Sequence, residues 1–161
     1  MVLADLPDHA RLHLVPCDPP LAAADAEALV AQADKLFTQF AREGRLGAWA
    51  IEAQVDGAVL AMAWVGDADL SGCSRDKVAR LLLTHEECTG RRLLGAPPIL
   101  VATTAGARCV DRRGLRELIA SGAVEGVYDL RAATLGAWRS AGRVPLAQSP
   151  FAALAGGTTA S

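Results

Sequence analysis

A hairpin signal in residues 48–65 constrains the fold more than any other feature of the sequence. The segments AWAIEAQV (48–55) and AVLAMAWV (58–65) are two apolar runs of strand length, separated by the dipeptide Asp56-Gly57. An Asp-Gly pair between two such runs favours a tight turn, because the central positions of that turn need positive φ angles. Residues 48–65 are therefore predicted to form two adjacent antiparallel strands of a sheet.

The rest of the chain alternates between strand-like and helical patterns of apolar residues. Strands are predicted at 11–17, at 97–110 with a turn at Ala105-Gly106, and at 125–130, and helices at 21–43, from near Ser74 onward, at 111–122 and at 131–142. The resulting order is β-α-β-β-α-β-α-β-α, which predicts an α/β (α+β) fold with helices packed on a single mixed sheet. Residues 1–150 are expected to form a single α/β domain, and residues 151–161 a flexible C-terminal tail.

The composition argues against disorder and against membrane insertion. The chain has 161 residues, of which 52% are hydrophobic and 21% charged, so it can bury a core of its own. Its most apolar run, GAVLAMAWVG (57–66), has about half of the roughly 20 residues that a membrane-spanning helix needs. The N-terminus has no basic start and no apolar signal core.

Cysteine usage points to a reducing compartment. Cys17, Cys73, Cys88 and Cys109 are widely scattered and no secretion signal precedes them. Reduced thiols in the cytoplasm are therefore expected, with a bridge between Cys17 and Cys109 or between Cys73 and Cys88 as the alternative.

Charge is unevenly distributed along the chain. Residues 1–70 hold four Lys or Arg and eleven Asp or Glu, whereas residues 71–161 hold twelve and seven. This asymmetry fits either a basic surface that binds an anionic ligand or two halves whose charges face each other or solvent. The second interpretation is favoured, since net charge informs on partners and solubility and not on fold.

The segment DLSGCSRDKVARLL (69–82) resembles the LSGGQ signature loop of ABC-transporter ATPases. Nucleotide binding in that class also requires a G-x-x-x-x-G-K-[ST] loop, whose backbone amides and lysine hold the phosphates. Lys35 and Lys77 are the only lysines of the chain, and neither follows a glycine-rich loop. Cys73 also replaces the second glycine of the signature. The chain is therefore predicted not to be an ATPase and to use no cofactor.

Four segments together resemble a bacterial family of functionally uncharacterised proteins of about 160 residues. They are ARLHLVPCDPPL, DLSGCSRDKVARLL, CVDRRGLRELIASGAV and VYDLRAATLGAWRSAGRVPLAQSPF, and they cover roughly residues 10–151. Members of that family typically read SGCSIDSS at the central loop, and many carry an "ABC transporter ATPase" label. This chain departs from the family with SRDKV after the cysteine and with SPFAAL in place of a C-terminal Trp-His pair. The resemblance implies one compact domain and draws attention to the SGCS loop at residues 71–74.

Two interpretations of Cys73 are open. If Ser74 is the N-cap of the following helix, Cys73 lies just ahead of a helix N-terminus, where the helix dipole and Arg75 favour the thiolate. Ser71, Gly72 and the free amides there would form an anion-binding nest. Cys73 is then a reactive or ligand-binding thiol. In the favoured interpretation it is a packing cysteine of intermediate exposure, and the serines are helix caps.

Neither a catalytic base nor a metal site accompanies Cys73 in the sequence. His85 lies eleven residues beyond Ser74 on the same helix, which corresponds to about 16 Å, too far for a nucleophile–base hydrogen bond. His9 and His13 can approach Cys73 only if the fold brings them there. His85 and Cys88 have i,i+3 spacing, but a two-residue half-site is a weak metal signal, so no metal is predicted.

The segment RCVDRRGLR (108–116) concentrates arginines at the start of the helix predicted at 111–122, with Asp111 as its N-cap and Gly122 just past its end. Arg112, Arg113 and Arg116 are candidates for binding a phosphate, and Arg91 and Arg92 could join them. A solvated helix face is favoured, because no aromatic residues are interleaved with the arginines, and nucleic-acid binding is not expected.

These observations predict a cytoplasmic, single-domain binding or adaptor module without a cofactor. Its partner would be an unknown protein or a small anionic ligand. The oligomeric state is left open, with a homodimer as one alternative. The candidate binding residues are Ser71, Gly72, Ser74, Arg75, Arg112 and Arg113. The alternative function is a thiol-dependent enzyme or redox protein centred on Cys73.

Overall fold

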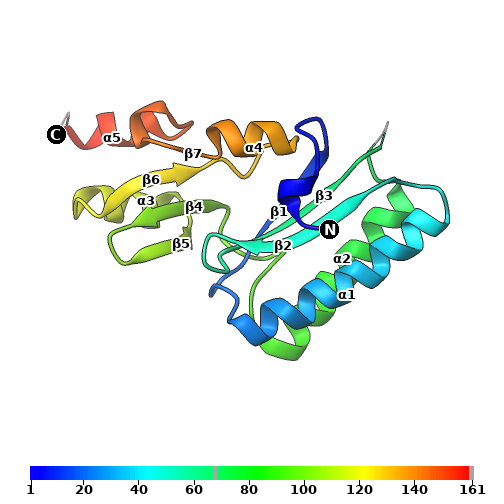
Figure 1. Ribbon diagram of the computed structural model, residues 1–161. Coiled ribbons are helices and arrows are strands. Elements are labelled where there is room, and N and C mark those ends of the chain that lie inside the picture. The colour runs from blue at the N-terminus through cyan, green and yellow to red at the C-terminus, as the bar shows by residue number, and fades with distance from the viewer. Residues whose placement is uncertain (67–68, 160–161) are drawn as a thin grey trace.

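The computed structural model of the protein describes residues 1–66 and 69–159 (Figure 1). The first three strands form an antiparallel sheet in the order β1-β3-β2. These strands are β1 (Arg11–Pro16), β2 (Trp49–Gln54) and β3 (Val59–Trp64). The predicted hairpin is confirmed, because β2 pairs with β3 and the turn residues Asp56 and Gly57 have φ angles of 52° and 86°.

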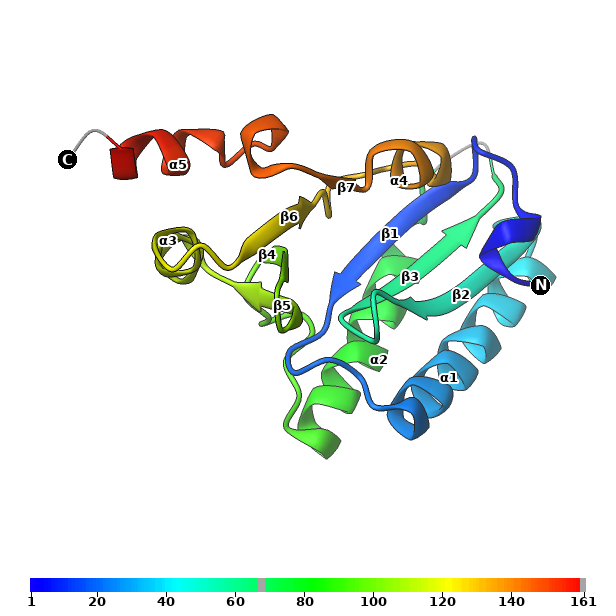
Figure 2. The same ribbon diagram turned by 60° about the vertical axis from the view of Figure 1, so that its left-hand side comes forward.

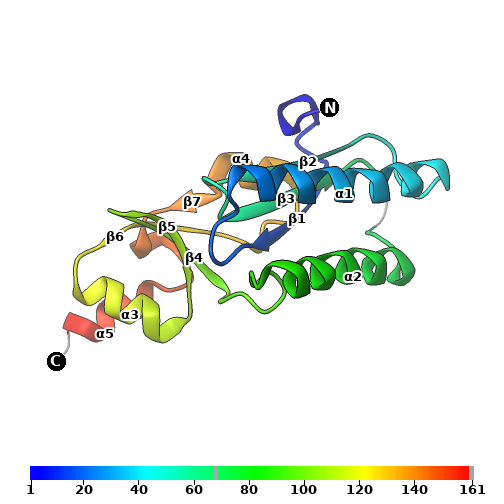
Figure 3. The ribbon, with the colours of Figure 1, turned by 90° about the horizontal axis from the view of Figure 1, so that it is seen from below.

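Helices α1 (Ala23–Arg42) and α2 (Gly72–Thr89) cover one face of this sheet and lie side by side on it (Figure 3). Phe37 and Phe40 of α1 lie one helical turn apart, so both reach the sheet. They share a buried cluster with Leu82 of α2 and with Leu60 and Met62 of β3. Burial of side chains of this size stabilises the fold by roughly 1.5–3 kcal/mol each.

The second half of the chain forms another antiparallel sheet, in the order β5-β4-β6-β7. Its strands are β4 (Ile99–Thr103), β5 (Gly106–Val110), β6 (Val124–Tyr128) and β7 (Arg143–Val144). The helices of this half are α3 (Arg112–Ala120), α4 (Leu135–Ala141) and α5 (Ala152–Thr159). Two 3-10 helices complete the described elements, η1 (Leu3–Asp5) and η2 (Leu146–Gln148).

The two sheets pack together through the face of the first sheet that α1 and α2 leave free (Figure 2). Leu12 and Leu14 of β1 share a buried cluster there with Leu100 of β4 and Leu135 of α4. The Leu12 amide also donates a 3.0 Å hydrogen bond to the carbonyl oxygen of Ala133. The β1 strand therefore belongs to the first sheet but is also fixed by the second half of the chain.

The α/β class is confirmed, while two antiparallel sheets take the place of the single mixed sheet that the sequence predicted. A helix joins β1 to β2, and another joins β5 to β6. The two strands of each pair do not pair with each other, because a third strand lies between them. In both sheets, that central position is taken by a hairpin partner, β3 or β4. Residues 97–110 form this second hairpin, β4–β5, with its turn next to the predicted Ala105-Gly106.

The C-terminal segment, predicted as a flexible tail, contains a helix. Residues 152–159 of the predicted flexible tail form α5, because Phe151 and Leu154 are spaced to pack together in the apolar cluster of the second sheet. Residues 160–161 of that segment lie outside the described part of the chain. Within residues 1–66 and 69–159, every helix is too short or too polar to cross a membrane.

Candidate functional site

The SGCS loop forms the first turn of α2, which begins earlier than the sequence predicted. Ser71, and not Ser74, is the N-cap residue: its hydroxyl oxygen accepts a 3.2 Å hydrogen bond from the Ser74 amide. Gly72 and Cys73 are therefore the first two residues of the helix, and Cys73 lies within the first turn rather than ahead of it. The two serines can both cap a helix, and the fold selects the first of them.

Arg45, which the sequence analysis missed, fixes both serines of the loop. Its guanidinium donates hydrogen bonds of 2.6 Å to the Ser74 hydroxyl and 3.2 Å to the Ser71 hydroxyl, and forms a 2.7 Å ion pair with Glu43. Ser74 is fully buried, so its hydroxyl depends on such a partner. These contacts within the protein satisfy the two hydroxyls that were predicted to bind an anion.

Cys73 is exposed in the structure, which corrects the expectation of a packing cysteine with intermediate exposure. Its neighbours Ser71 and Ser74 bond to Arg45, whereas Cys73 lies on the exposed side of this first turn. No polar side chain of the described residues hydrogen-bonds its thiol. A nucleophile–base pair is therefore not assembled around Cys73 in this state.

The histidines of the chain do not supply that base. His85 lies near the other end of α2, where burial, followed by the charge of Arg91, lowers its pKa against an opposing effect of Asp25. Its Nε2 atom is buried and has no hydrogen-bond partner among the described residues. His13 projects from β1 into a different environment, a cavity that it shares with Arg75.

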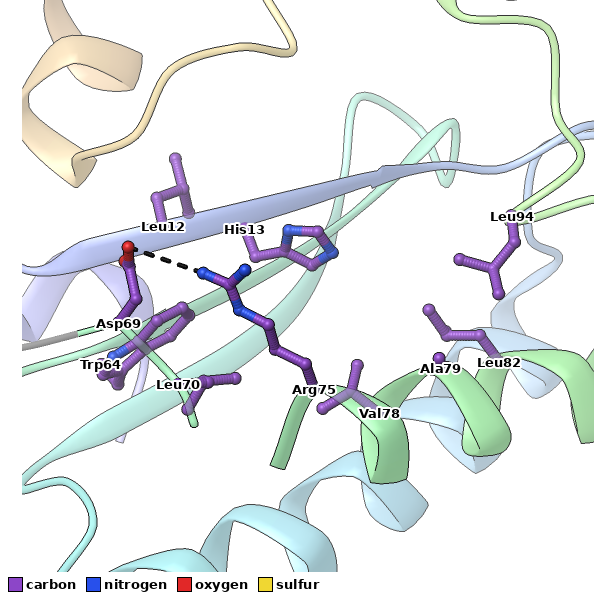
Figure 4. Close-up of a pocket in the computed structure, with 10 residues that line it drawn as sticks. All are labelled: Leu12, His13, Trp64, Asp69, Leu70, Arg75, Val78, Ala79, Leu82 and Leu94. Atoms are coloured by element: carbon purple, nitrogen blue, oxygen red, sulfur yellow. Dashed lines mark ion pairs between the residues drawn. The ribbon is translucent and has the colours of Figure 1, made fainter. Parts of the chain in front are cut away.

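This cavity lies between β1 and α2 and has a volume of about 420 Å³ (Figure 4). We call it the β1–α2 cavity. Its walls are mostly apolar and come from both elements, from the end of β3 and from the loop after α2. The apolar lining residues are Leu12, Trp64, Leu70, Val78, Ala79, Leu82 and Leu94. His13, on the edge strand β1, is exposed at this cavity.

Three polar side chains lie at this cavity: His13, Asp69 and Arg75 (Figure 4). Arg75 forms a 3.5 Å ion pair with Asp69, and Arg11 forms a closer one of 3.0 Å with the same carboxylate. Partial desolvation, followed by the charge of Arg75, lowers the pKa of His13 below 6.5. At neutral pH the cavity therefore presents a guanidinium, a neutral imidazole and a carboxylate above apolar walls.

Three of the arginines predicted as a phosphate patch, Arg112, Arg113 and Arg116, lie in the first turns of α3, whereas Arg91 and Arg92 lie elsewhere. Arg112 lines a separate cavity of about 310 Å³, with its guanidinium 6.0 Å from the centre of the Phe151 ring. Arg113 is 89% exposed and pairs with Glu117 along the same helix. Arg91 and Arg92 do not join them, because they bind Asp25 and Asp18 in the first half of the chain.

These pairs also bear on the uneven charge distribution. Asp8, Asp18, Asp25 and Asp69 of the acidic half each pair with an arginine of the basic half, at positions 139, 92, 91 and 75. The two halves therefore neutralise each other in part, as the favoured interpretation predicted.

The four cysteines are free, and Cys17 and Cys109 are buried where the two halves meet, with the Cys109 thiol 3.7 Å from the carbonyl oxygen of Cys17. Burial, the first cause in each case, raises the pKa of Cys17 to about 12 and that of Cys109 to about 11. Within residues 1–66 and 69–159, no three His, Cys, Asp or Glu side chains gather as metal ligands. His85 and Cys88 thus remain a half-site.

No protein family model matches the chain, and neither a curated protein nor a solved structure matches it. The resemblance to the SGCS-loop family stays a prediction from the residues. The candidate site is therefore defined by its own geometry. Two sequence-predicted residues line cavities, Arg75 the β1–α2 cavity and Arg112 the smaller one, and the β1–α2 cavity is the larger of the two.

Proposed function

We propose that the protein is a binding module that holds a small anionic molecule with an apolar body in the β1–α2 cavity. One observation carries this proposal: Arg75 stands at the mouth of a cavity whose other walls are mainly apolar. Small-molecule sites typically have volumes of about 300–1,000 Å³, apolar linings and a few polar groups that orient the ligand. The β1–α2 cavity, at about 420 Å³, has this combination.

Arg75 can bind a ligand anion at low cost. Its pair with Asp69 is weak, because the atoms are 3.5 Å apart and the two side chains are 63% and 62% exposed. Exposed pairs of this kind contribute about 0–1 kcal/mol. If Arg75 turns to a ligand carboxylate, Asp69 keeps its 3.0 Å pair with Arg11. The guanidinium can then offer two parallel N–H donors to the carboxylate.

His13 makes the proposed interaction sensitive to pH. Its imidazole shares the cavity with Arg75, and its pKa is lowered in the free protein. A bound anion favours the protonated imidazole and raises that pKa, so ligand binding takes up a proton. Affinity for an anionic ligand is therefore expected to increase as the pH falls through the His13 titration.

The test uses a fluorescent probe with an apolar body and one negative charge, 8-anilinonaphthalene-1-sulfonate. Arg75→Gln removes the charge at the mouth, and Ala79→Phe fills the cavity from its half-buried rim. Arg113→Gln is the matched control, since it removes an equally charged side chain from an exposed helix away from the cavity. We expect Arg75→Gln to weaken probe binding by about tenfold, as for the loss of a charge-assisted hydrogen bond.

Octanoate and octylamine distinguish the charge requirement from simple apolar binding. Octanoate should displace the probe from the original protein better than octylamine, and Arg75→Gln should abolish that preference. Equal affinities of the Arg75→Gln and Arg113→Gln proteins for the probe would refute the proposal. Unchanged binding by Ala79→Phe would place the probe elsewhere and would refute it as well.

The alternative, a thiol-dependent enzyme or redox protein centred on Cys73, is supported by the exposure of that thiol in the first turn of α2. It lacks a hydrogen-bonded base among the described residues, so the binding module is favoured. The cytoplasmic location and a homodimeric assembly stay predictions.

A further inference from the structure

Helices α1 and α2 lie side by side (Figure 3). Side chains on their exposed side line a groove between them. We call it the α1–α2 groove. Leu36 and Leu81, both partly buried against the core, lie along it, and Lys35, Lys77 and Arg80 line it with them. Its volume is about 430 Å³. The groove shares no lining residue with the β1–α2 cavity, so it is an independent surface.

The charge of the groove is of one sign. The only two lysines of the chain, Lys35 and Lys77, line the groove together with Arg80. No acidic side chain of the described residues lines it. The described residues form no ion pair with these three cations. Glu43 is not among the lining residues: the hydrogen bond from Gln39, followed by the charges of Arg45 and Lys77, lowers its pKa, and it already pairs with Arg45.

The dimensions of the groove fit a helix. Its lining extends from Gln32 to Gln39 on α1 and from Lys77 to Thr84 on α2, so the end residues are seven positions apart on each helix. At 1.5 Å per residue this corresponds to about 10 Å, or two helical turns. A third helix packed in such a groove buries leucines at i and i+4 against Leu36 and Leu81 and places the flanking residues near the three cations.

We propose that the α1–α2 groove binds an acidic amphipathic helix of a partner protein, with apolar residues on the leucines and Glu or Asp side chains against Lys35, Lys77 and Arg80. Charge complementarity selects this occupant. A nucleic acid fits less well, because the groove has three cations, no aromatic side chain on which bases could stack and leucines along its length.

The test measures fluorescence anisotropy of a labelled helical peptide of about 18 residues, a length that supports helix formation. The peptide carries leucines at i,i+4 spacing and glutamates beside them. A second peptide has the same composition with the leucines distributed around the helix, and a third has lysines in place of the glutamates. The first peptide should bind, more weakly at higher salt, and the other two should bind at least about tenfold less tightly.

Variants of the protein locate the binding. Lys35→Glu, Lys77→Glu and Arg80→Glu together should abolish binding, and the milder triple replacement by Gln should weaken it at least about tenfold. The matched control replaces Arg108, Arg113 and Arg116 by Glu. This changes the net charge by the same amount, but on an exposed surface of the second half of the chain. Arg75→Gln should leave peptide binding unchanged, which separates this proposal from the β1–α2 cavity.

Three outcomes would overturn the inference. The first is equal binding of the two glutamate peptides, and the second is an equal loss in the groove and control variants. The third is tighter, competing binding of a duplex oligonucleotide at the same salt concentration, which would assign the groove to nucleic acid. Circular dichroism of each variant establishes that its helices are intact.

Discussion

The turn between β2 and β3 is bonded to the segment just before α1, and a substitution at Gly57 tests how much this contact stabilises the protein. Gly57 has a φ angle of 86°, and its carbonyl oxygen accepts a 2.8 Å hydrogen bond from the amide of Leu21, just before α1. A Cβ atom at position 57 would overlap the carbonyl oxygen of Leu21 and lie 2.9 Å from its nitrogen. Because these atoms are backbone, the connection between turn and helix must shift.

Gly57→Ala is expected to destabilise the protein by about 3 kcal/mol. The positive φ angle costs an alanine about 1–2 kcal/mol, and disrupting the hydrogen bond of Leu21 costs about 1–3 kcal/mol more. This is a large part of the roughly 5–15 kcal/mol that stabilises a domain. Urea unfolding, followed by tryptophan fluorescence, to which the buried Trp64 contributes, measures the loss.

Two further glycines separate the cost of the positive φ angle from the cost of the contact with Leu21. Gly44 also has a positive φ angle, 71°, but a Cβ atom there meets nothing within 4 Å, so Gly44→Ala should cost only the conformational part. Gly72 is helical with equally open surroundings, so Gly72→Ala should be neutral or slightly stabilising. If Gly57→Ala and Gly44→Ala destabilise the protein equally, the contact with Leu21 carries no energy and the reasoning is wrong.

Two more predictions concern titrating groups. Maleimide labelling at pH 7 should modify the exposed Cys73 and Cys88 in the folded protein, and the buried Cys17 and Cys109 only after unfolding; mass spectrometry checks this, and rapid labelling of Cys17 would contradict it. A fast phase that belongs to Cys73 alone, and that Cys73→Ser removes, would support the thiol alternative. The Glu86 carboxylate accepts hydrogen bonds from the amides of Leu93, Leu94 and Gly95, and these bonds, that of Leu93 foremost, lower its pKa below 4.5. A depressed acid pKa stabilises the fold above the unfolded-state pKa, and this stabilisation is lost as the pH falls through the folded-state value, so Glu86→Gln should destabilise the protein more at pH 7 than at pH 3. Equal losses in urea unfolding at the two pH values would contradict it.

Local signals in the sequence were sufficient where the structure depends on neighbouring residues. The Asp-Gly pair predicted the β2–β3 hairpin because the turn needs positive φ angles and the strands flank it directly. Asp111 caps α3 as predicted, with its carboxylate accepting a 2.7 Å hydrogen bond from the Gly114 amide. Gly122, with a φ angle of 71°, follows the end of that helix as expected.

The candidate site depends on contacts between distant residues, which local patterns do not contain. Ser71 and Ser74 are equally good caps by type, and Arg45, more than 25 residues earlier, bonds to both of them. Arg75 was a candidate because of its place beside Cys73. Its meeting with His13 in one cavity requires that α2 pack beside β1, which no single segment encodes. The division of the strands into two sheets likewise depends on long-range pairing.

The order of the two sheets along the chain has a consequence for synthesis on the ribosome. All pairing partners within the first sheet lie between residues 11 and 64, and its covering helices end at Thr89. This layer can therefore assemble while later residues are still being translated. Its other face, with Leu12 and Leu14, stays uncovered until Leu100 and Leu135 emerge. For that interval the nascent chain carries an exposed apolar surface, the kind of surface that chaperones bind.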